Sequence, residues 1–481
     1  MSFVRFKTLK SGKKYAYQIT SFWDPEKEQA RSKSIYLGVV DENNNIIAKG
    51  QLKSNKILKY NKEKLILDFG NGYLFSEFIK KSLIFSPIKP ILDTFPELIS
   101  LMCYRLCNSG PMYNCNTWIS GNIISKIKKN EDLSSQNISR ILKYLGDESV
   151  QRDFFIKYIK LIGGSKKNII IDATSLPNNI SSYFNAWGHS DTGIEKQFRF
   201  LCVLDQISKM PLFYRFLPGN ITDISTLETT ISELKKLGVK NSFVLLDAGY
   251  FSEKNITELR DKKIDFLIRI PSSRKIYKNI INKNTKKIES IENAVIVNTR
   301  SLFIKAIKCI FYKKMGYIYI ILNPDKKAKD VDRIVKDMQE NNTEEKNNKD
   351  KDKYSLTGAG IFMLASSKKI PTTDVLSAYY MRISIEQVFG FSKEDLDILP
   401  IRCHSDDTIK GYLFFQFLLL VIFIEIRKCL NNKYTVEQAE IITRNLKCKV
   451  FDDDIIISEL DKNQKEIFKL CSILVPTTLG I

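Results

Sequence analysis

The sequence predicts an α/β fold in which a mixed β-sheet is flanked by helices. Two short apolar segments, residues 168–172 (NIIID) and 242–247 (SFVLLD), are typical of buried strands, and each ends on an aspartate. Between them lie a strand hairpin, residues 197–204 and 211–217, and a helical segment, residues 222–238, that closes on a glycine. The first, third and fourth strands run in the same direction. We therefore expect a right-handed crossover, with the first and fourth strands paired in parallel.

The charge balance indicates the kind of partner. The 481 residues include 75 Lys and Arg against 54 Asp and Glu, a formal net charge of +21. Such an excess favours a polyanion, of which nucleic acid is the commonest. The alternative is a solvated basic surface without a partner.

Two features bear on cellular location. The N-terminal residues 1–14 lack the apolar segment of a signal peptide, and the nine cysteines form no CxxC pair. The most apolar run, residues 412–426, has an uncharged core shorter than the ~18–20 residues of a membrane span. We expect a cytoplasmic protein with reduced thiols, no membrane partner and a core helix at this run.

At ~150 residues per domain, the length suggests about three domains. Hydrophobic patterning changes along the chain and defines four regions. They are an N-terminal β-hairpin region (1–72), a helical and probable DNA-binding region (73–163), an α/β domain (164–430) with a β-rich insertion (271–358), and a C-terminal α/β segment (431–481). In the second region, residues 133–146 fit either a helix-turn-helix reader of DNA or plain helix packing.

A mostly apolar segment, residues 379–393, carries Tyr379, Arg382, Glu386 and Lys393. At about 100° per residue, a single helix would place these four side chains in one stripe about 60° wide. A Glu in an apolar helix needs a partner or a metal. One reading is a partly exposed helix face on which Arg382 pairs with Glu386 four residues later.

The other reading joins Glu386 to Asp172 and Asp247, which would stand together at the carboxyl edge of the sheet. Taken singly, each aspartate could serve only to start a turn. Three carboxylates, however, can bind two hard divalent cations, and such pairs catalyse phosphoryl transfer without a nucleophilic side chain. A basic stripe beside Glu386 would then bind DNA phosphates.

With these residues in view, the sequence resembles the DDE transposases of bacterial insertion sequences. The Tyr-x2-Arg-x3-Glu-x6-Lys signature of one subgroup is matched in full by the four residues of segment 379–393. The two aspartates stand in similar contexts, IIIDATS and LLDAGYFS, and the stretches Gly188-His189-Ser190 and LPGNITD (217–223) resemble connecting motifs. The resemblance covers about residues 168–423.

The resemblance implies a ribonuclease-H-like core in which Asp172, Asp247 and Glu386 are catalytic and bind two Mg²⁺ ions, with Mn²⁺ as a substitute. It also implies that Tyr379, Arg382 and Lys393 contact DNA. The implied partners are double-stranded DNA with terminal inverted repeats, target DNA, and a second copy of the chain in the DNA complex. The implied location is the bacterial cytoplasm, on the nucleoid.

Other functions stay open at this point. The chain could be a catalytically inactive copy that binds DNA as a regulator, or a related nuclease without strand transfer. A glycosidase with a carboxylate pair is disfavoured by the net charge of +21 and by the Arg and Lys beside Glu386. The sequence assigns no role to Trp187 or His189.

Overall fold

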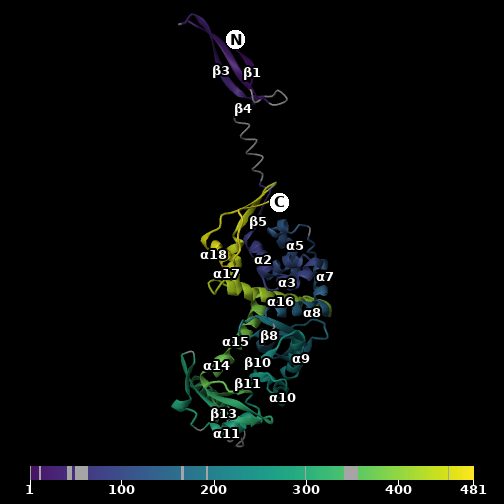
Figure 1. The fold of residues 1–481 in the computed structure, drawn as a ribbon, viewed down its shortest axis with the longest axis vertical. Helices are drawn as coiled ribbons and strands as arrows, with labels where there is room; N and C mark the ends of the chain where they lie inside the picture. Colours follow the sequence, from purple (N-terminus) through teal and green to yellow (C-terminus); the bar gives the residue numbers. More distant parts are fainter. Residues whose placement is uncertain are drawn as a thin grey trace.

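The computed structural model describes residues 2–480 except 10–11, 26, 41–45, 49–62, 130, 164–166, 191–192, 286, 298, 341–355 and 453. Within this part of the chain, helices combine with three β-sheets. A mixed α/β fold is therefore confirmed. Figure 1 shows the main sheet at one end of the molecule, a helical layer in the middle, and a separate N-terminal sheet at the other end.

The main sheet has the strand order β12-β13-β14-β15-β11-β10-β6-β8-β7, with β9 also paired to β8. Its strands are β6 (Lys167–Pro177), β7 (Ala186–Ser190), β8 (Gly193–Asp205), β9 (Pro211–Pro218), β10 (Asn241–Leu246), β11 (Asp265–Ile270), β12 (Ala294–Val297), β13 (Arg300–Phe311), β14 (Lys314–Leu322) and β15 (Ile361–Ser366).

Strands β6 and β10 pair in parallel, as the sequence predicted. Ile171 is opposite Leu246 in this pairing, and the preceding residues of both strands are buried on both faces of the sheet. One detail differs: β6 does not end at Asp172 but continues to Pro177, paired with β8. The extra length arises because residues 197–202 of β8 extend past the end of β10, so β6 keeps a partner after β10 has ended.

The helix that links β9 to β10 is α9 (Asp223–Lys236), followed after β10 by the turn η2 (Ala248–Tyr250) and α10 (Glu253–Asp261). In Figure 1, α9 and α10 lie to the right of the sheet, with α14 (Thr372–Tyr380) and α15 (Ile383–Gly390) to its left.

The β-rich segment after β11 extends the main sheet. Strands β12, β13 and β14 form an antiparallel meander, and β15 joins β14 to β11. Helices α11 (Lys275–Asn284) and α12 (Pro324–Glu340) belong to the same segment. The predicted β-rich insertion is therefore continuous with the strands that lead to the aspartates.

The middle layer is helical. It contains α2 (Gly70–Lys81), α3 (Phe85–Thr94), α4 (Leu98–Cys107), η1 (Met112–Asn114), α5 (Cys115–Ser120), α6 (Ile124–Ile127), α7 (Ser135–Leu145), α8 (Glu148–Leu161) and α16 (Asp406–Cys429). Helix α7 begins at Ser134, whose hydroxyl accepts a hydrogen bond from the Asn137 N–H. Its apolar face packs on α16.

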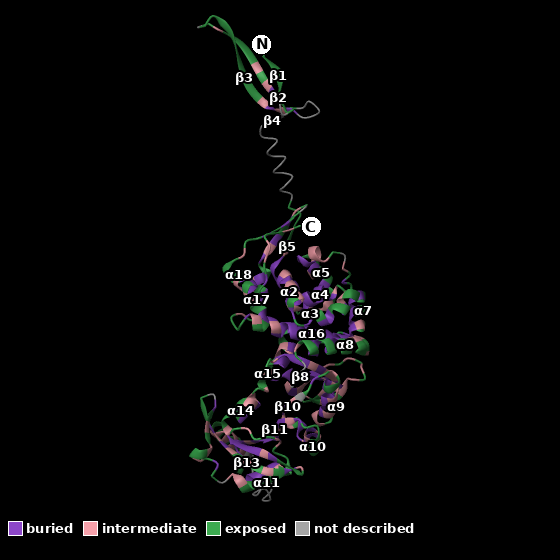
Figure 2. Ribbon diagram, viewed as in Figure 1, coloured by how far each residue is buried: buried purple, intermediate pink, exposed green. Residues whose placement is uncertain are grey.

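The apolar run at residues 412–426 belongs to helix α16, and the prediction about its length requires a correction. The helix has 24 residues, and among the described residues it is the one helix long and apolar enough to cross a membrane by length and composition. The expectation that its apolar run is too short was therefore wrong. However, 89% of its most apolar window is buried inside the protein, which agrees with a core helix. Figure 2 shows α16 mostly in the colour of buried residues.

Residues 379–393 do not form the single helix that the sequence predicted. Helix α14 ends at Tyr380, and α15 begins at Ile383. Backbone hydrogen bonds from Arg382 to Tyr379 and from Ile385 to Arg382 span three residues instead of four, which tightens the chain at the break. After α15 the chain continues as a short π-helical turn, η4 (Phe391–Asp395).

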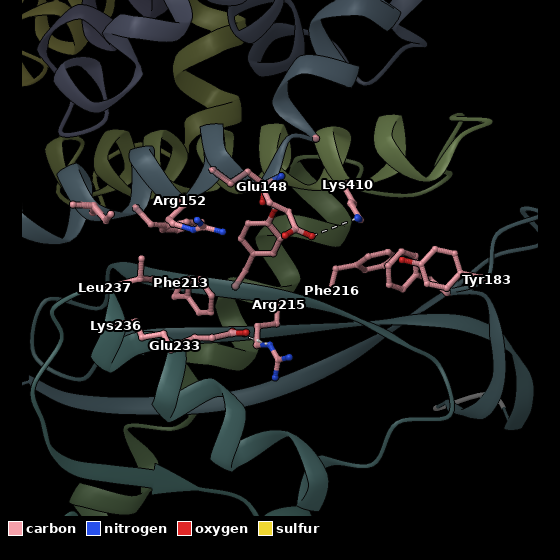
Figure 3. A pocket seen from close by; sticks show the side chains of 16 residues that line it. Glu148, Arg152, Tyr183, Phe213, Arg215, Phe216, Glu233, Lys236, Leu237 and Lys410 are labelled. Atoms are coloured by element: carbon pink, nitrogen blue, oxygen red, sulfur yellow. Dashed lines mark hydrogen bonds and ion pairs between the residues drawn. The ribbon is translucent and has the colours of Figure 1, made fainter.

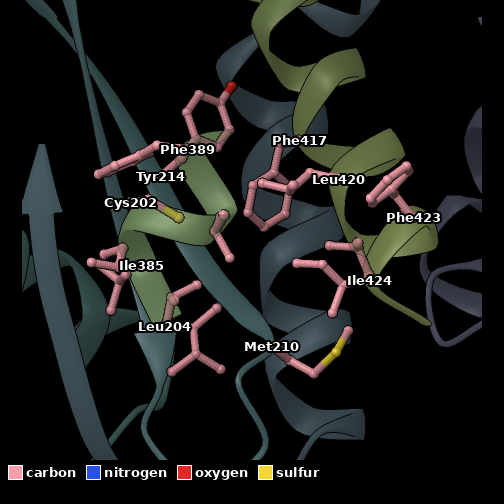
Figure 4. Close-up of a cluster of buried hydrophobic side chains, with 14 of the residues drawn as sticks. Cys202, Leu204, Met210, Tyr214, Ile385, Phe389, Phe417, Leu420, Phe423 and Ile424 are labelled. Atoms are coloured by element: carbon pink, nitrogen blue, oxygen red, sulfur yellow. The ribbon is translucent and has the colours of Figure 1, made fainter. Parts of the chain in front are cut away.

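Helix α15 is fixed by the apolar side chains on one of its faces. Figure 4 shows Ile385 and Phe389 of α15 in a cluster of buried side chains with Cys202 and Leu204 of β8 and Phe417 and Leu420 of α16. Ile385 is fully buried, and the Phe389 ring meets Phe200 at a centroid distance of 6.4 Å. This packing fixes α15, from which Glu386 extends toward Arg382 and the edge of the sheet.

Two smaller sheets lie outside the α/β core. Strands β1 (Ser2–Thr8), β2 (Lys14–Asp24), β3 (Gln29–Val40) and β4 (Ile46–Ala48) form the N-terminal sheet. The second sheet has the order β18-β17-β16-β5 and joins β5 (Leu65–Asp68) to β16 (Lys447–Val450), β17 (Asp454–Ile457) and β18 (Thr478–Gly480). Helices α17 (Val436–Arg444) and α18 (Lys462–Leu470) complete the C-terminal segment.

The contact between α7 and α16 can be tested at Gly411. A β-carbon at this position would lie 1.7 Å from the Leu142 carbonyl oxygen. We expect Gly411→Ala to destabilise the protein by about 1–3 kcal/mol, because one helix must move. Gly390→Ala is the control, since its β-carbon would meet nothing within 4 Å. Equal melting temperatures for the two variants in calorimetry would contradict this packing.

Candidate active site

Asp172 and Asp247 stand beside each other at the end of the parallel strand pair. Each directly follows a residue of the last matched pair, Ile171 and Leu246. The backbone N–H of Ala173 donates a hydrogen bond of 2.9 Å to Asp172 Oδ1. The expectation that the fold brings both aspartates to this edge of the sheet agrees with the geometry.

Glu386 reaches the two aspartates through the guanidinium of Arg382. Arg382 Nη1 lies 3.0 Å from Asp172 Oδ2 and 3.8 Å from Asp247 Oδ2, and Nη2 lies 2.7 Å from Glu386 Oε1. The ion pair of the first reading is therefore present, and it also includes both aspartates of the second reading. Metal binding by the three carboxylates stays a prediction. One cation contacts carboxylates from three separate segments.

Tyr379 belongs to the same cluster. Its hydroxyl donates a hydrogen bond of 3.1 Å to Asp247 Oδ1, and the Arg382 guanidinium lies 5.9 Å from the centre of its ring. The break between α14 and α15 makes this arrangement possible, because it turns Tyr379 and Arg382 toward the aspartates while α15 carries Glu386.

The cluster becomes more exposed from Asp172 to Glu386. Asp172 is 15% exposed, Asp247 34% and Glu386 51%. Burial raises the pKa of Asp172 to about 7, although the Ala173 N–H and Arg382 oppose the rise. Burial lowers the pKa of Arg382, but Asp247 and the other anionic neighbours outweigh it and leave that pKa raised. The guanidinium therefore stays charged.

The carboxylates have the donor chemistry of a divalent metal site. Carboxylate oxygens are the ligands that Mg²⁺ and Mn²⁺ prefer, and all three side chains already contact one positive charge. Within the described ranges, no three His, Cys, Asp or Glu side chains are close enough together to hold a metal ion without rearrangement. The three residues therefore have suitable ligand chemistry for a metal, but in this structure they contact the Arg382 guanidinium instead.

Lys393 is not brought to the cluster. It lies in η4, partly buried, and its ammonium forms no ion pair with a described carboxylate within 4.0 Å. Trp187 and His189 lie on the edge strand β7 with exposed side chains. Lys196 lies 5.9 Å from the centre of the Trp187 ring.

The sequence did not single out a second ion pair beside the aspartates. Arg199 on β8 contacts Asp223 at the start of α9, and Asp223 lies against Gly249 in the turn after Asp247. The sequence feature that could have pointed to Asp223 is its position as the last residue of the LPGNITD motif. That motif also meets the Gly188-His189-Ser190 motif, because Gly188 packs on the Gly219 carbonyl.

One cavity lies away from the carboxylates, which are not among its lining residues. It has a volume of about 800 Å³ and opens between α8, β9 and α9. Figure 3 shows Arg152, Arg215, Lys236 and Lys410 around it together with several aromatic rings. Arg215 pairs with Glu233 and Lys410 with Glu148, so much of this charge is balanced inside the cavity.

The fold and the carboxylate cluster define an α/β protein with an acidic site at the edge of a mixed sheet. A family profile described as "Transposase DDE domain" matches residues 163–422, more than half of the chain. The chain therefore belongs to the transposase DDE domain family. A comparison with curated proteins gave no match.

Solved structures offer more distant likenesses. One is a piggyBac transposase synaptic complex with hairpin DNA, at 10% identity and a TM-score of 0.37, covering 83% of this chain and 70% of that chain. Another is the Drosophila P element transposase strand transfer complex, at 10% identity and a TM-score of 0.20, covering 71% and 82%. At these scores neither structure bears on the geometry of the site.

The raised pKa of Asp172 predicts a pH-dependent stability difference. Because its pKa of about 7 in the folded protein exceeds the ordinary value near 4, this group lowers the stability as the pH rises between those values. Asp172→Asn removes the effect, so its melting temperature relative to wild type should rise from pH 4 to pH 7 and then level off. The corresponding gain in the free energy of unfolding, relative to wild type, is at most about 4 kcal/mol.

The measurement is calorimetry in EDTA across this pH range, with Asp93→Asn at an exposed position of α3 as the control. A constant difference between Asp172→Asn and wild type would contradict the burial of this carboxylate.

Proposed function

We propose that the protein is a metal-dependent DNA transposase with a ribonuclease-H-like core. It cleaves the ends of an insertion sequence and joins them to target DNA by two-metal phosphoryl transfer. The substrates are double-stranded DNA with terminal inverted repeats and target DNA, and two copies of the chain act on paired ends. The setting is the bacterial cytoplasm.

One observation carries this proposal: carboxylates from β6, the end of β10 and α15 contact a single cation at one edge of the sheet. An isolated helix-face ion pair would need only Arg382 and Glu386. The additional contacts to Asp172 and Asp247 support a site built to bind positive charge. Membership of the transposase DDE domain family supports the same assignment.

In this proposal, Asp172, Asp247 and Glu386 bind Mg²⁺ or Mn²⁺. The metals supply activation of the attacking oxygen and stabilisation of the leaving oxygen. Tyr379 orients Asp247 through its hydroxyl, and the Ala173 N–H orients Asp172. Arg382 exchanges its carboxylate contacts for a DNA phosphate, for which the planar guanidinium is well suited. Lys393 contributes a second phosphate contact.

The decisive experiment is strand cleavage. Labelled DNA from both flanks of the gene is incubated with the purified protein in Mg²⁺ or in EDTA. Wild type should nick at a fixed position only with Mg²⁺, whereas Asp172→Asn and Glu386→Gln should lose cleavage on the order of 10⁴-fold, the scale of removing a catalytic group. Both variants should still bind the DNA.

Each other outcome points to a different function. Binding without cleavage in any metal would indicate an inactive regulatory copy. Cleavage without joining to a target would indicate a nuclease. Equal loss of cleavage and DNA binding in Asp172→Asn would contradict a role for Asp172 in metal binding.

The role of Lys393 can be tested by salt titration. Lys393→Ala should weaken binding to end DNA and make the slope of log affinity against log salt shallower by about one, because one phosphate contact is lost. Fluorescence anisotropy from 50 to 300 mM salt measures the slope. Lys236→Ala, at the cavity of Figure 3, is the control. If the salt dependence of Lys393→Ala has the same slope as that of wild type, Lys393 does not contact a DNA phosphate.

A further inference from the structure

Arg199 and Asp223 form an enclosed ion pair next to the carboxylate cluster. Arg199 Nη2 lies 2.5 Å from Asp223 Oδ1, and the side chains are 18% and 22% exposed. The Nε atom of Arg199 is buried and has no hydrogen-bond partner among the described atoms. Enclosing two charges in this way carries a desolvation cost that a surface pair avoids. The enclosed position of this pair is therefore not explained by the solubility that charged surface residues provide.

The second oxygen of Asp223 touches the turn that follows Asp247. A β-carbon added at Gly249 would lie 2.6 Å from Asp223 Oδ2 and 3.5 Å from its Cγ. Residue 249 must therefore be glycine if the carboxylate of Asp223 is to stay in place. Gly249 belongs to η2, which is closed by a 3.2 Å hydrogen bond from the Tyr250 N–H to the Asp247 carbonyl.

Asp247 depends on this turn for its direction. Its side chain makes no capping hydrogen bond within η2 and accepts one from Tyr379 instead. Burial raises the pKa of Asp223, Arg199 lowers it, and Asp247 raises it again, so the two carboxylates interact electrostatically. Arg199 therefore offsets part of the repulsion between the two carboxylates.

We propose that Arg199 and Asp223 position Asp247: the ion pair fixes Asp223 against Gly249, and this contact sets the turn from which the Asp247 carboxylate reaches the metal site. The inference rests on the proposed function, because it assigns Asp247 to metal binding. In this proposal, the aspartate of the LPGNITD motif and the glycine of LLDAGYFS both serve to align Asp247. Neither Arg199 nor Asp223 touches substrate in this role.

The test compares the metal dependence of variants of the full-length protein. For Asp223→Asn, Arg199→Gln and Gly249→Ala, the Mg²⁺ concentration for half-maximal cleavage should rise about 10- to 100-fold, as when groups that orient metal ligands are lost. The KM for DNA should stay unchanged. Arg199→Lys, which keeps the positive charge, should recover most of the wild-type metal dependence. Calorimetry measures Mn²⁺ binding independently of cleavage. The Mn²⁺ affinity should fall in the variants that need more Mg²⁺ for cleavage and should be largely restored in Arg199→Lys.

Arg215→Gln is a matched control. Arg215 lies on the neighbouring strand β9, is also 18% exposed, and pairs with Glu233 near the other end of α9 at 3.1 Å. We expect it to lower the melting temperature about as much as Arg199→Gln but to leave Mn²⁺ affinity unchanged. If Arg199→Gln does not fold, Gly249→Ala and Asp223→Asn carry the comparison.

Two results would overturn the inference, and they are distinguishable. If wild type cleaves DNA and the Arg199 and Asp223 variants match Arg215→Gln in metal dependence, the pair is only structural and the proposed function stands. If wild type neither binds Mn²⁺ nor cleaves DNA in any metal, the proposed function fails and the inference fails with it.

Discussion

The parallel pairing of β6 with β10 is the constraint on which the site depends. It places two aspartates in adjacent positions where β10 ends and β6 continues with β8. Like charges so close together repel, and burial adds to the cost, as the raised pKa of Asp172 indicates. A cation must balance them. Arg382, at the break before α15, supplies that charge and brings Glu386 into the same cluster.

Hydrophobic packing makes this electrostatic arrangement possible. Helix α15 is fixed through Ile385, which is fully buried, and through Phe389, whose ring meets Phe200 of β8; both lie in the buried cluster of Figure 4. Apolar contacts made by neighbouring residues of the same helix therefore help to fix Glu386. The position of a charged residue is set here by its uncharged neighbours.

The strands that lead to the aspartates and the crossover helix could be predicted from the sequence, because each has a clear local periodicity. The parallel pairing of the two strands followed from the rule for crossover connections. Sequence reasoning could not identify the break at Met381 and Arg382, since the residues there have ordinary helical dihedral angles and differ only in hydrogen-bond spacing. The contact of Asp223 with Gly249 was equally hidden. It joins segments whose proximity arises only when α9 packs beside η2.

The position of α16 in the chain has a consequence for synthesis. Its apolar surface covers α7, which lies far earlier in the sequence, and Gly411 lets the two backbones meet at Leu142. While the protein emerges from the ribosome, α7 is complete long before its cover exists. The unfinished chain exposes apolar surface for most of its translation, a condition that favours aggregation and engages chaperones. Chains truncated before residue 406 lack α16 and cannot bury that surface in this way.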